Sequence, residues 1–385
     1  MEAAELLEII ARGEDGKHQF KANITNVSGL ATEMVAFSNS GGGQIFIGVN
    51  DNGQIAGLSR EDMGRLNQLV SNAASQSTHP PINPQTENIA LLTGELVMVV
   101  SVSDGNSKPY MDNSGAIWVK SGADKRKVTS REEMQRIFQN MGLIHADEIP
   151  VDGLSIADVD LDYFKKFFQQ VFSEDLEKQE LPFPTLLENM NLMKEGILNL
   201  SGALLFARSP QFKIPAFIVK AVSYPGTDIH VSDYRDSQDM VGKLEVVFSQ
   251  TMSFLTRNLR HVQMGQGVNS QGELEIPKIA LEELLVNALI HRDYFISSPV
   301  RVFIFEDRIE IISPGHLPNN LTLENIKTGN SNIRNPILAS FATRILPYRG
   351  LGNGVRRALK EYPHIGFNDD REGNQFVVTI YRTIK

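Results

Sequence analysis

The sequence predicts an α/β protein of two or three domains, and three observations lead to this fold class. The first 142 residues alternate helical patterns with short β-rich runs separated by Gly, Asn and Asp turns. Residues 277–294 place apolar side chains at helical spacing, and two β-rich runs follow at 301–305 and 308–312. A length of 385 residues, with 41% hydrophobic and 22% charged residues, suits two or three globular domains.

Composition excludes several classes of protein. The chain has no cysteine, so disulfides and cysteine-ligated metal sites are impossible. No run approaches the roughly 20 apolar residues that cross a membrane, and the acidic, amphipathic start does not resemble a signal peptide. A net charge of −9 disfavours a surface covered in nucleic-acid contacts but permits a local basic patch. We therefore expect a cytoplasmic protein with no membrane partner.

The N-terminal 142 residues predict a regular succession of elements. A helix over 2–12 ends at Gly13, and a turn leads into a strand before residue 24. The next helix should bury Leu30, Met34, Val35 and Phe37. Residues 41–43 form a glycine loop, and residues 51–53 signal a hairpin. Ser59 and Asp62 fit a capping box, and Ser130 a helix cap. The remaining strands are predicted at 44–49, 54–56, 88–92, 96–102 and 116–120, the last followed by a basic turn.

The rest of the chain begins with an acidic, polar stretch that reads as a junction. Helices are expected near 163–172, 186–193, 200–208 and 242–257, with a strand over 216–224 and a Gly/Gln-rich loop over 264–272. The helix over 277–294 should bury one face and start near Pro277. A segment over 345–362, with three glycines just before a helix, and a last strand at 375–382 complete the pattern.

A polar stripe interrupts the otherwise apolar helix over 277–294. Glu283, Asn287 and His291 follow one another at four-residue intervals, so their side chains align along the helix. A carboxylate, an amide and an imidazole in this arrangement could hold a water molecule and a metal ion. The alternative is a surface helix whose polar stripe faces water.

The stretch ALEELLVNALIHRDY resembles the first ATP-binding motif of the GHKL class, which includes gyrase, Hsp90, histidine kinases and MutL. The resemblance implies that Glu283 is the general base and that Asn287 holds Mg²⁺ against the nucleotide phosphates. The HRDY ending resembles RecG-like proteins, often called transcriptional regulators, which carry an N-terminal Schlafen-type AlbA-like domain. It implies an AlbA-like domain (1–142), a connector (143–270) and a GHKL-like ATP-binding sandwich (271–385).

Further ATP-binding residues follow from the same resemblance. His291 is included as part of the HRDY ending of the motif. Ser313-Pro314-Gly315 stands where the usual Asp-x-Gly-x-Gly motif would read adenine, so Gly315 is included without an adenine-reading Asp. Residues 328–339 resemble a lid segment in which Arg334 and Asn335 contact phosphates. Glycines that open a helix offer free N–H donors to phosphate, and here they are Gly350, Gly352 and Gly354.

The N-terminal half resembles the Schlafen-type AlbA-like domain through Phe20-Lys21, AFSNSGGGQIFIGVNDNGQIAG, KPYM and IWVKSGADKRKV. The basic residues would form a phosphate-contacting edge for DNA or RNA, with Tyr110 and Trp118 available for stacking on bases. The predicted contacts are Lys21, Lys108, Lys120, Lys125, Arg126 and Lys127. A solvated basic turn is the alternative.

Some Schlafen relatives are nucleases with an acidic metal site early in this domain. Glu14 and Asp51 could supply carboxylates for such a site. The usual Glu-Phe-Lys is Gln19-Phe20-Lys21 here, and a neutral amide is a poor Mg²⁺ ligand. We expect binding without cleavage.

The leading hypothesis is a bacterial ATP-binding regulatory protein that engages nucleic acid, switches conformation with ATP and Mg²⁺, and forms a homo-oligomer. Weak ATPase activity is compatible with it. The alternatives are an ATP-gated nuclease or defence effector and a scaffold whose sites are vestigial.

Overall fold

The structure is a computed structural model that describes residues 1–229, 232–262, 272–318 and 321–382. The chain forms two compact units, Met1–Ile144 and His145–Lys385. The predicted ATP-binding domain falls in the second unit, and so does the predicted connector except for Leu143 and Ile144. Most of the predicted loop at 264–272 lies outside the described residues.

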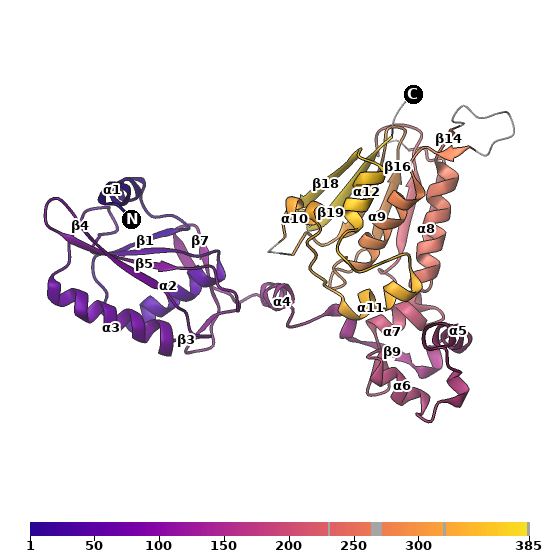
Figure 1. Cartoon of the computed structure of the whole chain (residues 1–385), viewed down its shortest axis with the longest axis horizontal. Coiled ribbons are helices and arrows are strands. Elements are labelled where there is room, and N and C mark those ends of the chain that lie inside the picture. The colour runs from indigo at the N-terminus through magenta and orange to yellow at the C-terminus, as the bar shows by residue number, and fades with distance from the viewer. Residues whose placement is uncertain (230–231, 263–271, 319–320, 383–385) are drawn as a thin grey trace. The chain divides into compact units, whose positions relative to one another are not determined.

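A four-stranded sheet with helices on both faces forms the first unit (Figure 1). Its strands, in spatial order, are β1 (His18–Lys21), β2 (Gly43–Ile47), β5 (Leu96–Val102) and β4 (Gln85–Ala90). β1 runs parallel to β2, and the other neighbours are antiparallel. Side chains alternate along β2, so Ile45 and Ile47 pack with α2 (Val27–Asn39) and α3 (Arg60–Gln76), whereas Phe46 packs with α1 (Ala3–Arg12).

Several predicted features of this unit are confirmed. Ser59 and Asp62 form the capping box of α3, and Ser130 caps α4 (Arg131–Asn140). The basic run was wrongly predicted as a turn. It forms strand β8 (Asp124–Lys127), which pairs with β7 (Trp118–Ser121) across a turn at Gly122, where φ is +63°. The predicted strand at 54–56 is reduced to one bridge, between Ile55 and Val49. A further pair joins β3 (Thr78–His79) and β6 (Met111–Asp112).

The second unit opens with a small sheet and an aromatic-rich group of helices. The sheet is formed by β9 (Pro150–Ser155), β10 (Met193–Lys194) and β11 (Ile197–Asn199). The accompanying helices are α5 (Leu161–Phe172), α6 (Phe183–Asn189) and α7 (Leu200–Phe206). Phe164 is fully buried and contacts Phe167, Phe183 and Phe206. This layer continues into the main core of the unit.

A six-stranded sheet organises the rest of the second unit. Its strands, in spatial order, are β13 (Asp236–Met240), β12 (Val219–Ser223), β16 (Val300–Ile304), β17 (Arg308–Pro314), β19 (Gln375–Tyr381) and β18 (Ile365–Asp370). Only β12 and β16 are parallel. β12 and β13 come from the segment assigned to the connector, so that segment supplies one edge of this sheet. The helices are α8 (Leu244–Asn258), α9 (Lys278–Ile290), α10 (Leu323–Thr328), α11 (Pro336–Ile345) and α12 (Gly354–Glu361), and β14 (His261–Val262) pairs with β15 (Glu273–Leu274).

Helix α9 is the centre of this arrangement (Figure 1). It packs on β17 and is flanked by α8, α11 and α12. The expectation of one buried face was wrong, since Leu281, Leu284, Leu285, Val286 and Leu289 are buried on several sides while Ile279 is 47% exposed. The helix is enclosed because neighbours cover more of its circumference than the apolar periodicity indicated.

Candidate functional site

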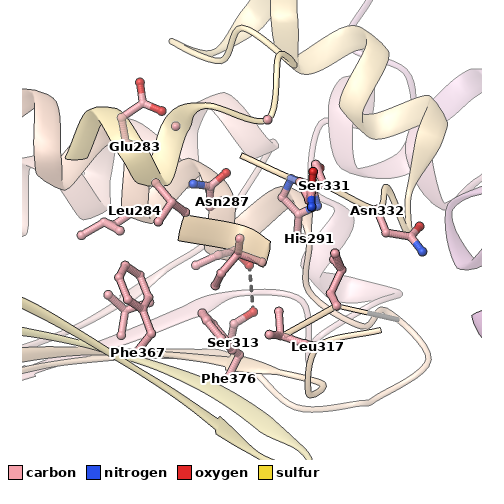
Figure 2. Close-up of a pocket in the computed structure, with 18 of the residues that line it drawn as sticks. Glu283, Leu284, Asn287, His291, Ser313, Leu317, Ser331, Asn332, Phe367 and Phe376 are labelled. Atoms are coloured by element: carbon pink, nitrogen blue, oxygen red, sulfur yellow. Dashed lines mark hydrogen bonds between the residues drawn. The ribbon is translucent and has the colours of Figure 1, made fainter. Parts of the chain in front are cut away.

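The polar stripe of α9 faces a pocket. Figure 2 shows Glu283, Asn287 and His291 in a row along the helix, with Phe367 and Phe376 on the opposite side, which the sheet provides. The backbone N–H of His291 donates to the carbonyl of Asn287, which closes the last turn. The interpretation of the stripe as a solvent-facing surface is wrong for this fold, because Glu283 is only 6% exposed.

Segments far apart in sequence enclose this pocket. They are α9, the end of β17 with the turn after it, the loop before α11, and the glycine segment before α12. The polar lining includes Glu283, Asn287, His291, Gly315, Arg334, Arg349, Gly350, Gly352, Gly354 and Arg357. Among the described lining residues Glu283 is the only acid, against three arginines, so the pocket favours an anion.

The glycine segment brings the start of α12 against the polar stripe. A Cβ atom at Gly354 would lie 2.5 Å from Oε2 of Glu283 and 3.3 Å from Nδ2 of Asn287. Gly352 has φ +70°, and a Cβ atom there would lie 2.5 Å from the Gly329 carbonyl oxygen. Asn353 precedes α12 without a side-chain capping bond. The first N–H groups of α12 are therefore available to a ligand of the pocket.

Arg357, in the second turn of α12, forms an ion pair with Glu283. The side chains are 26% and 8% exposed respectively, so the pair is largely removed from bulk water. Nε of Arg357 is buried and has no acceptor among the described residues. Arg357 was not among the residues predicted from the sequence. Its position three residues into a glycine-opened helix is the signal that could have identified it.

Arg334 approaches the same pocket from the loop before α11. Its Nη2 donates to the carbonyl of His316 at 2.6 Å, and its Nε is a second buried donor with no acceptor among the described residues. Burial lowers the pKa of this guanidinium, and Asp293 and Asp369 oppose the shift. Buried donors are normally paired, so Arg334 and Arg357 each present a hydrogen bond that an anionic ligand could accept.

His291 lines the pocket as a neutral imidazole. Burial, aided by the charge of Arg334, lowers its pKa from 6.5 to about 4. Its Nε2 lies 3.2 Å from the hydroxyl of Tyr348, another residue that the sequence analysis did not name. At neutral pH His291 therefore adds a polar contact but no charge to the site.

Asn335 does not line the pocket. It is 1% exposed, and its side-chain amide donates to the carbonyls of Ile290 and Arg292 at 2.8 and 2.9 Å. These contacts fasten the loop before α11 to the end of α9. The geometry therefore argues against the prediction that Asn335 contacts phosphate, because its donors are already used.

The sheet side of the pocket is apolar. Phe367 of β18 and Phe376 of β19 contribute to it, and Leu284 of α9 and Leu317 after β17 extend the apolar surface (Figure 2). The hydroxyl of Ser313 donates to the Ala288 carbonyl at 3.0 Å. Such a surface suits a flat, apolar ring system beside the cationic end formed by the arginines.

In the first unit, most of the predicted nucleic-acid contacts are paired with acids or polar groups. Lys21 lies 3.8 Å from Asp51, Lys108 2.5 Å from Asp104, Lys125 2.5 Å from Glu33, and Arg126 2.6 Å from Glu133. Lys120 donates to Gln19, and burial lowers the pKa of Lys120. Lys120 and Lys127 have no ion pair within the described part of the chain, and of the two only Lys120 has a side-chain hydrogen-bond partner.

The aromatic pair predicted to stack on bases is mostly committed to packing. Tyr110 is 8% exposed in the core of the first unit. Trp118 packs against that core, and its Nε1 donates to Asp112 at 2.8 Å. Both therefore act as structural side chains in this geometry.

The two carboxylates considered for a nuclease metal site are used in other ways. Oε1 of Glu14 accepts hydrogen bonds from the side chain of Gln19 and the backbone N–H of Phe20 at 2.5 and 2.6 Å. Asp51 is exposed beside Lys21. Across the described ranges, no three His, Cys, Asp or Glu residues come together as a metal site would require. The geometry therefore does not support a metal site formed by Glu14 and Asp51.

Comparisons with known proteins agree with the two units. The family model "Schlafen, AlbA_2" matches residues 14–129, and the model "Putative ATP-dependent DNA helicase recG C-terminal" matches residues 297–380. The chain therefore contains a Schlafen AlbA_2 domain followed by a RecG C-terminal, HATPase-like domain. Glu283, Asn287 and His291 lie before the second match, so their roles rest on geometry. Among the described residues, none of the helices is long and apolar enough to span a bilayer.

Two of the solved structures that resemble the chain illustrate the level of similarity. One is the DIP2311 protein of Corynebacterium diphtheriae, with 20% identity, coverage of 98% of this chain and 80% of that one, and a TM-score of 0.49. The other is the N-terminal domain of a RecG-related protein from Nitrosomonas europaea, with 18% identity, coverage of 34% and 96%, and a TM-score of 0.24. Neither similarity is high enough to carry an argument about function. No curated protein matches the chain.

Proposed function

We propose that the second unit binds ATP with Mg²⁺ in the pocket between α9 and α12, and that the first unit engages nucleic acid. The protein would act as a nucleotide-dependent regulator, and control of transcription is the role that the resemblance stated in the sequence analysis implies. A homo-oligomeric state and a cytoplasmic location stay expectations from the sequence.

The observation that carries the nucleotide proposal is a pair of unmatched donors. Arg334 and Arg357 line one pocket from different elements, and each keeps a buried Nε–H without an acceptor in the described structure. An unmatched buried donor costs roughly 1–3 kcal/mol, so two in one cavity favour a ligand with several acceptor oxygens. Phosphate groups meet this requirement, and the open N-terminus of α12 adds further donors.

The residues present also fit a Mg²⁺ ion. Phosphate oxygens are the hard, anionic ligands that Mg²⁺ prefers, and the amide oxygen of Asn287 would add one neutral ligand beside them. The ion would neutralise phosphate charge. Glu283 would serve as the base that accepts a proton from an attacking water molecule, if ATP is hydrolysed. The apolar sheet side, with Phe367 and Phe376, would receive the base of the nucleotide.

Hydrogen bonds between the first residues of the second unit and the loop that carries Arg334 support the proposed conformational change on nucleotide binding. His145, the first residue of the second unit, has its Nδ1 3.1 Å from the carbonyl oxygen of Arg334. Asp147 is fully buried, and its Oδ2 accepts the backbone N–H groups of Ile337 and Leu338 at the start of α11. A ligand that moves the loop containing Arg334 would therefore disturb the first residues after the boundary.

The test of nucleotide binding is calorimetry with ATP and Mg²⁺. Wild type should bind, and Asn287→Ala should weaken binding by about 2–4 kcal/mol, because phosphate charge loses its metal-mediated partner. Glu282→Ala is the matched control, since Glu282 is the neighbouring acid on α9, pairs with Lys278 and does not line the pocket. Equal ATP affinity in wild type and Asn287→Ala would reject the site. Absence of any binding in wild type would favour a scaffold with vestigial sites.

A further inference from the structure

The proposed base is not free in this structure. The carboxylate of Glu283 is ion-paired with Arg357, and it is the only acid among the described residues of the pocket lining. A carboxylate held by a guanidinium is compensated, so it is poorly placed to accept a proton from water. Hydrolysis by Glu283 would therefore require Arg357 to leave this contact first.

Arg357 is equipped to move toward an anion. Its guanidinium presents five donors in a planar fork that matches carboxylate and phosphate oxygens. One of these donors, Nε–H, is buried and lacks an acceptor in the described structure, although the residue lines the pocket. The carboxylate, the guanidinium and the open start of α12 thus lie together, since Gly354 approaches Oε2 of Glu283.

We propose that Arg357 is a positioning residue that recognises the terminal phosphate of the bound nucleotide and, by doing so, releases Glu283. The inference deepens the proposed function and rests on it. A triphosphate would compete with Glu283 for one guanidinium, whereas a diphosphate lacks the group that competes. The contact between Arg357 and the terminal phosphate would therefore form with a triphosphate and not with a diphosphate. Glu283 would be released as a base only when the triphosphate is bound.

A purely structural role for Arg357 makes a different forecast. If Arg357 only neutralises a buried carboxylate, its loss should lower stability and weaken ATP and ADP alike. Competition between carboxylate and phosphate instead couples Glu283 to ATP affinity. Removing the negative charge of Glu283 would then leave Arg357 free in advance, which should tighten ATP binding.

The experiment is a double-mutant cycle read out by calorimetric affinities for ATP and ADP in Mg²⁺. Arg357→Ala should weaken ATP binding by roughly 10- to 100-fold, the range of a charge-assisted hydrogen bond, and change ADP binding much less. Glu283→Gln should tighten ATP binding several-fold when Arg357 is present and not when it is absent. Arg356→Ala is the matched control, because Arg356 is exposed on α12 and does not line the pocket.

Thermal unfolding of each variant guards against misfolding. If Arg357→Ala does not fold, Arg357→Gln and the Arg357→Ala/Glu283→Gln double variant, which leaves no unpaired carboxylate, answer the same question. Equal losses for ATP and ADP, or additive effects in the cycle, would overturn the proposal while leaving nucleotide binding intact. Failure of wild type and Arg356→Ala to bind either nucleotide would instead overturn the proposed function itself.

Discussion

Arg334 and Asn335 are neighbours in sequence and perform different tasks in the structure. Arg334 lines the pocket and has a buried Nε–H without an acceptor in the described structure. Asn335 is buried, and its side-chain amide donates to the carbonyls of Ile290 and Arg292. Motif resemblance treated both as phosphate contacts, because it assigns roles by sequence position. Which of two adjacent side chains reaches a ligand depends on the direction of each Cα–Cβ bond, and the backbone of the folded loop sets that direction.

At the residue scale, His291 should make stability depend on pH. Its pKa is about 4 in the folded protein and 6.5 in the unfolded chain, so only the unfolded state gains a proton between these values. Stability is thus fully present above pH 6.5 and falls as the pH drops toward 4, by up to about 3 kcal/mol. Urea unfolding of wild type and His291→Gln at pH 7 and pH 4.5 should show a smaller loss in the variant. The same loss in both proteins would contradict the assignment.

At the scale of elements, the β7–β8 hairpin contains basic residues that form ion pairs within the protein and one basic residue that is free to contact nucleic acid. Lys125 and Arg126 are held by Glu33 and Glu133, so reversing their charges would break ion pairs as well as any nucleic-acid contact. Lys127 is exposed and has no acidic partner in the described structure, which makes it the cleaner probe. The positive charge of a basic strand is largely neutralised when neighbouring elements supply acidic side chains. The amino-acid composition alone does not show whether such ion pairs form.

Lys127→Glu should therefore weaken the binding of single-stranded DNA or RNA in a salt-sensitive way. One lost phosphate contact reduces the slope of log affinity against log salt by about 1. Lys194→Glu makes the same charge change at an exposed lysine of the second unit and should leave binding unchanged. Filter binding at several salt concentrations measures both. An unchanged slope in Lys127→Glu would show that the hairpin is only a solvated surface.

At the scale of the whole molecule, the prediction concerns linkage between the two proposed ligands. If they are coupled, ATP changes the affinity for nucleic acid by a factor, typically 5 to 150, and nucleic acid changes the affinity for ATP by the same factor. His145→Ala should reduce this factor, because His145 contacts the loop that carries Arg334. His261→Ala, at an exposed histidine of β14, is the control. ATP titrations with and without single-stranded DNA give the factor. A coupling factor that is the same in His145→Ala and wild type would show that the contact between His145 and the Arg334 carbonyl does not couple the two ligands.

Local patterns were sufficient for much of the fold. β5 was predicted over the same residues that form it, α1 ends at Gly13 as expected, and the caps at Ser59 and Ser130 are present. These features depend on interactions within a few residues, such as apolar periodicity and hydrogen bonds from side chains to nearby backbone. For the same reason the Glu283–Asn287–His291 stripe was visible, since four residues make about one turn of any helix.

By itself, then, the sequence determined the α/β class, the two kinds of domain and the polar stripe of α9. Only the tertiary structure decided that Arg357 pairs with Glu283, that Asn335 is buried and that the edge of the six-stranded sheet includes β12 and β13. It also decided that four of the six basic residues predicted to contact nucleic acid are paired with acids. Each of these depends on residues that are distant in sequence and become neighbours through packing. Charge, burial and access to a ligand are properties of that packing, whereas periodicity and capping belong to the chain.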